Sequence, residues 1–282
     1  MGGETVIAVG QMRSTSSMKN NLSQVEILVR KAVKAGAKAL FLPEASDYIA
    51  HSVSETLSLV LPASASPYVL GLQSLAKANH LAITAGIHEP GLISPEKIRN
   101  TSIWIDEEGE IVQRYQKLHL FDMEIPGGPV ARESDVFEKG PEIHPPFQTA
   151  VGKIGLQICF DLRYPEPALS MKRQGAHIIT YPSAFTVPTG KAHWHLLLRA
   201  RAVETQCYAA QAGHHNEKRV SYGHSIIVGP WGEVLAELGG EFRDSDGNEG
   251  PAIVTATIDT SYVDKIRREV PLRRRWDVYA EL

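Results

Sequence analysis

Residues 153–166 read KIGLQICFDLRYPE, in which an apolar strand pattern, Ile154–Cys159, runs towards a cysteine and two prolines. A helix is predicted near Glu166–Gln174, and a second short strand is predicted at His177–Tyr181. This strand–helix–strand order is typical of proteins that cover a sheet with helices. The stretch therefore indicates an α/β fold.

The same alternation extends outward along the chain. Further strands are predicted at Thr5–Gly10, Ala39–Leu42, Leu81–His88, Tyr208–Ala212 and Ala252–Asp259. Helices are predicted from Leu22 to Gly36 and at Pro67–Asn79, Ala192–Gln206 and Ser261–Glu269. Hairpins are expected at 101–115 and around 229–232, and a long irregular stretch at 118–146. No linker divides these segments, so we expect a single domain over residues 1–282 with mixed sheets covered by helices.

Composition narrows the class of partner. The net charge of −3 over 282 residues gives no strong electrostatic field of one sign around the protein. This argues against nucleic acid as the main partner. No apolar run approaches the roughly 18 residues of a membrane span, so no membrane partner is expected. Two cysteines in a chain of this length make no disulfide framework and favour a reducing compartment. The cytosol is the expected location, with a mitochondrial pool left open.

Cys159 is the candidate nucleophile. Alternation along the strand places Ile154 and Ile158 on one face and Cys159 on the other, where the strand ends before a helix. Backbone N–H groups and a helix dipole at such a position would lower the pKa of the thiol. The competing interpretation is a buried packing residue, which is how Cys207 is interpreted.

Three segments carry a resemblance to a known family. They are FLPE (41–44), KLHLF (117–121) and ICFDLRYPE (158–166). In this order and spacing they resemble the nitrilase superfamily of carbon-nitrogen hydrolases, and the resemblance extends over essentially the whole chain. It implies a four-layer α-β-β-α sandwich and a homodimer. It also implies Cys159 as nucleophile, Glu44 as general base, and Lys117 at the oxyanion with the backbone N–H of Phe160.

Each of these residues has an ordinary alternative. Glu44 could be a helix-capping or surface carboxylate, and Lys117 a solvated lysine at a strand end. Without a partner, a Glu at the mouth of a buried pocket should have a raised pKa. The resemblance also implies a second carboxylate that orients the lysine and the substrate. Its position matches Glu133, with Glu124 and Glu138 as competitors in the same loop.

The substrate is narrowed by further resemblances. Phe160-Asp161 after the cysteine favours an amide over a nitrile. A narrower resemblance, to the deaminated glutathione amidases, is carried by GLQIC (155–159), YPSAFT (181–186), LRARAVETQC (198–207), SYGHS (221–225) and PWG (230–232). These enzymes release 2-oxoglutarate and cysteinylglycine through a thioester on the cysteine. The alternatives are an ω-amidase that acts on 2-oxoglutaramate, or an inactive interaction module on the same fold.

Such substrates carry an anionic 2-oxoacid end. Arg163 is the candidate partner for that carboxylate, with Phe160, Phe185 and Thr186 completing the binding site. The competing interpretation of Arg163 is an ion pair with Glu166 or Asp161 within the turn.

Eleven histidines raise the question of a metal. His193 and His195 stand two apart on a predicted helix and point to different faces, and the adjacent His214 and His215 diverge as well. No His-Glu-x-x-His or Cys-x-x-Cys pattern is present, so neither a metal nor another cofactor is expected. His195 is itself a departure, because the resembling enzymes commonly have Glu there.

Overall fold

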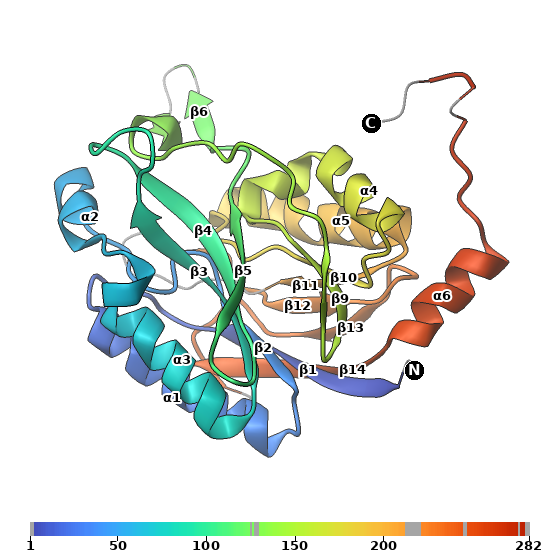
Figure 1. The fold of residues 1–282 in the computed structure, drawn as a ribbon, viewed down its shortest axis with the longest axis horizontal. Helices are drawn as coiled ribbons and strands as arrows, with labels where there is room; N and C mark the ends of the chain where they lie inside the picture. The colour runs from blue at the N-terminus through green and yellow to red at the C-terminus, as the bar shows by residue number, and fades with distance from the viewer. Residues whose placement is uncertain are drawn as a thin grey trace.

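The computed structural model describes residues 3–124, 126, 130–211, 221–244, 247–275 and 277–279. Its main feature is a pair of six-stranded sheets that face each other, with helices on the outer side of each sheet (Figure 1). Throughout these described ranges, every helix is too short or too polar to cross a bilayer. His214 and His215 lie outside them.

The first sheet has the order β14-β1-β2-β3-β4-β5. Its strands, in that order, are Ala252–Asp259, Glu4–Gln11, Ala39–Phe41, Ala82–Pro90, Ile98–Ile105 and Ile111–Gln116. Strands β1, β2 and β3 are parallel, and the remaining pairs are antiparallel. Because parallel strands end at the same edge, the residues that follow β2 and β3 come together there.

The second sheet has the order β13-β12-β11-β10-β9-β8. Its strands, in that order, are Val234–Glu237, Ile226–Val228, Tyr208–Gln211, Ile178–Thr180, Gly152–Leu156 and Phe147–Thr149. Strands β9, β10 and β11 are parallel. A separate small hairpin joins β6 (Asp122–Glu124) to β7 (Val130–Arg132).

The helices are α1 to α6, at Met18–Lys34, Val53–Leu59, Pro67–Asn79, Pro165–Arg173, Val187–Thr205 and Thr260–Glu269. Short 3-10 turns lie at Ala63–Ala65, Glu133–Asp135 and Cys159–Arg163. Local chemistry explains several boundaries. Ser66 caps α3 by accepting from the N–H of Val69, Pro67 occupies the first turn, and His80 ends the helix in the left-handed conformation.

Three hydrophobic cores bind the layers together. The first packs α1 and α3 against one face of the first sheet through residues such as Leu28 and Leu72. The second lies between the two sheets and includes Trp104 and Ile158. The third packs α4 and α5 on the outer face of the second sheet, around Trp194. This α-β-β-α order confirms the four-layer sandwich, and Figure 1 shows the two helix pairs on opposite sides of the sheets.

Several predicted segments differ from the structure. Helix α1 starts at Met18 instead of Leu22. Strand β9 ends at Leu156 instead of Cys159. Helix α5 starts at Val187 instead of Ala192, because Pro188 fits the first helical turn and does not delay it. The stretch 118–146, expected to be irregular, contains the β6–β7 hairpin and a 3-10 turn.

Candidate active site

Glu44 is held by a tight turn beyond β2. The N–H of Gly86 donates to the carbonyl of Pro43 (3.0 Å), and the N–H of Ser46 donates to the carbonyl of Gly86 (2.8 Å). A Cβ added at Gly86 would lie 2.5 Å from the Cα of Glu44, so only glycine permits this approach. Ala45 adopts a φ of 50°, which completes the turn. The backbone of β3 thus fixes the position of Glu44.

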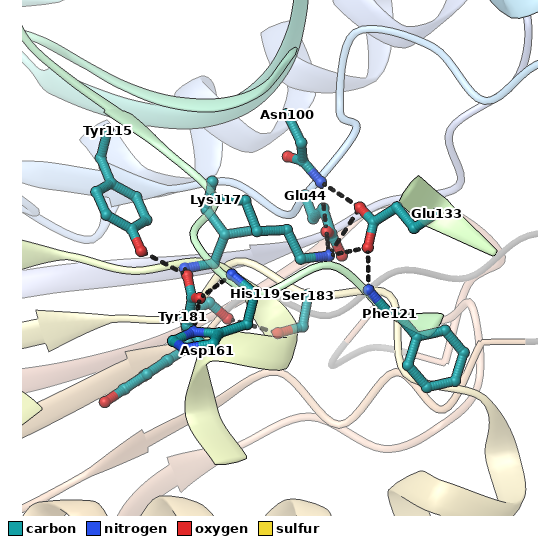
Figure 2. A network of polar contacts seen from close by, with 11 residues as sticks. Glu44, Asn100, Tyr115, Lys117, His119, Phe121, Glu133, Asp161, Tyr181 and Ser183 are labelled. Carbon is teal, nitrogen blue, oxygen red and sulfur yellow. Dashed lines mark hydrogen bonds and ion pairs between the residues drawn. The ribbon is translucent and has the colours of Figure 1, made fainter. Parts of the chain in front are cut away.

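Lys117 directly follows β5, and its side chain is 3% exposed. Its N–H donates to the carbonyl of Asn100 (3.0 Å), and its own carbonyl accepts from Gly140 (2.8 Å). The ammonium Nζ lies 2.9 Å from Glu44 Oε1 and 2.9 Å from each carboxylate oxygen of Glu133 (Figure 2). A buried ammonium therefore contacts two carboxylates.

Cys159 begins a 3-10 turn and does not close a strand. Its φ is 44°, a left-handed conformation that costs a non-glycine residue roughly 1–2 kcal/mol. Its N–H donates to the carbonyl of Pro182 (2.9 Å) beyond the neighbouring strand β10. The predicted position at the strand end was wrong because the chain leaves the sheet two residues earlier, at Gln157.

The carboxylate of Asp161 holds this turn. It is fully buried and accepts from the N–H of Ile158 (3.0 Å), the hydroxyl of Tyr115 (2.7 Å) and the N–H of His119 (3.0 Å). It also contacts His119 Nδ1 at 2.8 Å, and that ring stacks on Tyr164 at 3.7 Å between centroids. Asp161 thus ties the Cys159 turn to the Lys117 segment (Figure 2).

Glu44 and Lys117 stabilise each other's charge. Burial by itself would raise the pKa of Glu44, but the Lys117 ammonium and hydrogen bonds from Lys117, Cys159 and Asn100 hold it below its ordinary value. Burial would lower the pKa of Lys117, but Glu133, Glu44 and Cys159 raise it well above the ordinary range. A raised pKa was expected only for a Glu44 without a partner, and that condition is not met because Lys117 lies 2.9 Å from Glu44 Oε1.

The pKa of the Cys159 thiol shifts in the opposite direction to the one predicted from the sequence. Burial and the nearby Glu44 carboxylate raise its pKa, and these effects exceed the opposing effects of Lys117 and the Ala184 backbone. The lowered pKa predicted from the strand–helix context was wrong. The thiol therefore keeps its proton beside an ionised carboxylate that can accept it.

Among the three candidate second carboxylates, Glu133 alone contacts Lys117. Its Oε2 also accepts from the N–H of Phe121 at 2.6 Å. Glu124 pairs with Arg132 on the surface at 3.0 Å. Glu138 accepts from the N–H groups of the turn at 92–94, at 2.8–2.9 Å. The geometry therefore favours Glu133 for the role that the resemblance implied.

One cavity of about 900 Å³ contains these groups and the candidate substrate-binding residues. The Arg163 guanidinium lies 5.4 Å from the ring centroid of Phe160 and 5.7 Å from that of Phe185. It contacts His193 Nδ1 at 3.3 Å. Across the described part of the chain, no ion pair joins Arg163 to Asp161 or Glu166. Arg163 is thus directed at the cavity by two rings and an imidazole.

Phe185 and Thr186 form another part of the cavity wall. Phe185 is 7% exposed and packs edge-on against Trp194 at 4.9 Å. Thr186 precedes α5, is exposed, and its hydroxyl lies 2.8 Å from that of Thr189. The structure therefore places all the predicted catalytic and substrate-binding residues around one cavity.

Asn100 and the pair of Asp47 and His88 were not predicted from the sequence. Asn100 Nδ2 donates to Glu44 Oε1 (2.7 Å) and to Glu133 Oε1 (3.3 Å). His88 lines the cavity, and its Nδ1 lies 2.9 Å from Asp47 Oδ1, with both side chains buried. Polar residues inside apolar strand patterns are the signal that could have identified them.

Comparisons with known proteins agree with this geometry. Residues 6–268 match the model of the carbon-nitrogen hydrolase family. The chain is 44% identical to the probable hydrolase nit2 of Schizosaccharomyces pombe, covering 98% of this chain and 99% of that protein. It is 43% identical to the deaminated glutathione amidase of Homo sapiens, covering 98% and 84% respectively.

Two solved structures share the fold. The Caenorhabditis elegans NitFhit protein superposes with a TM-score of 0.89 at 38% identity, covering 99% of this chain and 66% of that one. Saccharomyces cerevisiae Nit3, a nitrilase superfamily member, gives a TM-score of 0.81 at 31% identity, covering 96% of each chain. Since the motifs, the four-layer fold and these likenesses agree, the chain belongs to the carbon-nitrogen hydrolase family of the nitrilase superfamily.

Proposed function

We propose that the chain, as one domain over residues 1–282, is a thiol amidohydrolase that forms a thioester on Cys159. Membership of the carbon-nitrogen hydrolase family makes it an amidase. The observation that carries the mechanism is the contact of Lys117 with Glu44 and Glu133 beside the Cys159 thiol, in a buried cavity. A base, a cation and a nucleophile therefore surround one position for a carbonyl.

In the first half of the reaction, Glu44 takes the thiol proton as Sγ bonds to the amide carbon. The carbonyl electron pair moves to oxygen, where the Lys117 ammonium and the backbone N–H of Phe160 stabilise the charge. Glu44 then gives its proton to the nitrogen, the C–N bond breaks and the amine leaves. Lys117 and Asn100 both bond to Oε1 of Glu44, which leaves Oε2 for the thiol.

The second half of the reaction regenerates the thiol. Glu44 takes a proton from water, and the resulting hydroxide attacks the thioester carbon at the same oxyanion position. The C–S bond breaks, the acid leaves, and the proton on Glu44 returns to Sγ. The raised pKa of Lys117 supports this proposal, because the ammonium stays charged through both halves.

The substrate we propose is deaminated glutathione, cleaved to 2-oxoglutarate and cysteinylglycine. Arg163 would pair with the 2-oxoacid carboxylate through its planar fork, with Phe160, Phe185 and Thr186 around it. Arg13 lines the same cavity and can meet a second carboxylate, that of the glycine end. A cavity of about 900 Å³ also suits a tripeptide-sized molecule more closely than a small amide.

An ω-amidase that acts on 2-oxoglutaramate is the second candidate, since Arg163 would serve that substrate equally. The test compares kcat/KM on the two amides. We expect at least about a tenfold preference for deaminated glutathione. Arg13→Gln should lower kcat/KM on deaminated glutathione alone. The group that 2-oxoglutaramate releases is ammonia, which carries no carboxylate for Arg13 to bind. A preference for 2-oxoglutaramate would instead assign the ω-amidase activity.

The mechanism is tested by Cys159→Ala, which should reduce turnover by at least about a thousandfold with the fold retained. Cys207→Ser is the matched control: Cys207 is buried away from the cavity, and its thiol contacts the carbonyl of Ala176 at 3.1 Å. Substantial turnover by Cys159→Ala would refute the assignment of Cys159 as the nucleophile. If the unaltered protein neither hydrolyses these amides nor reacts with iodoacetamide, an inactive interaction module is the better description.

We also propose a homodimer in the cytosol. Exposed apolar side chains on α5 and β13 and in the turn before β13 support an interface: Leu196 (66%), Val203 (47%), Trp231 (60%) and Val234 (42%). Both cysteines are free thiols, which fits a reducing compartment. Sedimentation equilibrium should report twice the chain mass of 30.9 kDa, and a monomer at all concentrations would exclude the dimer.

A further inference from the structure

Outside the catalytic cavity, three side chains from distant segments converge. His195 lies on α5, His224 precedes β12, and Glu237 ends β13. His195 Nε2 lies 2.7 Å, and His224 Nδ1 2.8 Å, from the same oxygen, Glu237 Oε1. One ligand atom from each residue falls within 4.8 Å of the others. None of the three lines the cavity.

The backbone holds His224 rigidly in this group. Its φ is 53° and follows the positive φ of Gly223, so the chain turns sharply and presents the ring. The Tyr222 ring stacks on the imidazole at 4.1 Å between centroids. On another side, a Cβ built at Gly240 would lie 3.1 Å from Nε2, so the glycine backbone packs directly on the ring. The imidazole is therefore fixed before any ligand arrives.

We propose that His195, His224 and Glu237 bind a divalent transition metal, with Zn²⁺ as the best match. Two imidazoles and one carboxylate form an established zinc ligand set, which leaves a fourth position for water. Bonds of about 2.0–2.1 Å in tetrahedral geometry place ligand atoms about 3.3 Å apart. The two spacings to Glu237 Oε1 would open by about half an ångström, and the two ring nitrogens lie within 4.8 Å of each other. In the single chain these side chains are 36%, 27% and 28% exposed. His195 and Glu237 lie on α5 and β13, the elements of the proposed dimer interface.

Binding requires an exchange of protons. Each ring nitrogen that faces Glu237 must offer its lone pair, so the proton moves to the other nitrogen of that ring or leaves to solvent. Bound metal would then connect α5 to β13 and to the segment before β12. Sequence patterns could not indicate this site, because residues 195, 224 and 237 form no short motif. The proposal does not depend on the amidase activity.

The experiment uses full-length protein, first alkylated with iodoacetamide so that Cys159 cannot bind zinc. Equilibrium dialysis against ZnCl₂ should show one more bound ion per chain than for His195→Gln or Glu237→Gln. Zinc at a concentration about a hundredfold above Kd should raise the thermal unfolding midpoint of the unaltered chain by about 5 °C. It should leave the midpoints of the two variants unchanged. Co²⁺ substitution should give the visible spectrum of a tetrahedral site.

The matched control is His80→Asn, which removes one exposed histidine elsewhere. Its left-handed φ of 47° suits Asn, so the fold should be undisturbed. This control should bind zinc as the unaltered chain does. Equal zinc stoichiometry in His195→Gln and the unaltered chain would overturn the proposal, and so would no binding in either. The three side chains would then form a hydrogen-bonded group only.

Discussion

At the scale of single residues, the reactive site is a charge arrangement in a buried cavity. The Lys117 ammonium lies between the Glu44 and Glu133 carboxylates, each at 2.9 Å. An unpaired buried charge would cost several kcal/mol, so removing one member leaves the others poorly compensated. This arrangement keeps Glu44 ionised, Lys117 cationic and the Cys159 thiol neutral, which are the charge states that the proposed mechanism requires.

Glu133→Gln tests the assignment of the second carboxylate. The amide oxygen can still accept from the N–H of Phe121, but it no longer balances Lys117. Lys117 would then pair more strongly with Glu44 and make it a weaker base. We expect kcat to fall by roughly 10- to 100-fold, measured under substrate saturation.

Glu124→Gln is the control for this experiment, because Glu124 is 67% exposed and pairs with a surface arginine. It should change kcat by less than about twofold. Equal losses of kcat in Glu133→Gln and Glu124→Gln would contradict the assignment of Glu133 as the second carboxylate.

The reactivity of Cys159 should depend strongly on pH. Burial raises its pKa above the ordinary 9.0, so the thiolate fraction at neutral pH is small. Below the folded-state pKa this fraction rises about tenfold per pH unit, and alkylation by iodoacetamide should rise with it. The rate, followed by mass spectrometry in the Cys207→Ser background, should climb through pH 7–9 without a plateau. A plateau below pH 8 would indicate a lowered pKa.

At the scale of elements, strand ends and tight turns place the reactive groups. Glu44 and Lys117 follow β2 and β5 of the first sheet, and Cys159 follows β9 of the second. Both Ala45 and Cys159 have positive φ values, so the chain turns sharply at each of these strand ends. In a continuing strand these side chains would point out of one face of the sheet, whereas the turns direct them into the cavity.

Gly86→Ala tests the turn at Glu44. The new Cβ would meet the Glu44 Cα at 2.5 Å, so the turn must shift. We expect a loss of about 1–3 kcal/mol in the free energy of unfolding, measured in urea. We also expect at least about a tenfold loss in kcat, because the base is displaced. Gly3→Ala, with no heavy atom within 4 Å, should match the unaltered protein in both measurements.

At the scale of the whole molecule, the two sheets must stay packed in one relative position, because the site takes residues from both. The core between them contains Trp104, which is 1% exposed and packs edge-on against Phe41 at 5.9 Å and Phe147 at 5.8 Å. These contacts join the first sheet to β8 of the second. Loss of this packing would separate Glu44 and Lys117 from Cys159.

Trp104→Ala should therefore reduce the free energy of unfolding by about 3–5 kcal/mol through the cavity that it leaves. Guanidinium unfolding followed by circular dichroism measures this change. Leu92→Ala, at a side chain that is 76% exposed, should change stability by less than about 0.5 kcal/mol. Similar effects of the two substitutions would mean that the core between the sheets contributes little.

The sequence by itself determined the elements with strong local signals and predicted the candidate reactive groups. Helix α3 and strand β14 have the predicted bounds, because a capping serine, a first-turn proline and clear apolar patterns mark them. Glu44, Lys117 and Cys159 were identified from three separated motifs, since each motif preserves its residue types in order.

Only the tertiary structure decided how these groups interact. It placed Glu133, and neither Glu124 nor Glu138, against Lys117, and it brought Asn100 and Asp161 into the network. It also reversed the expected pKa shift of Cys159 and supplied Glu44 with a partner that lowers its pKa. The physical reason is that burial and partner charges depend on atoms from distant segments, and a local pattern of residues does not contain those distances.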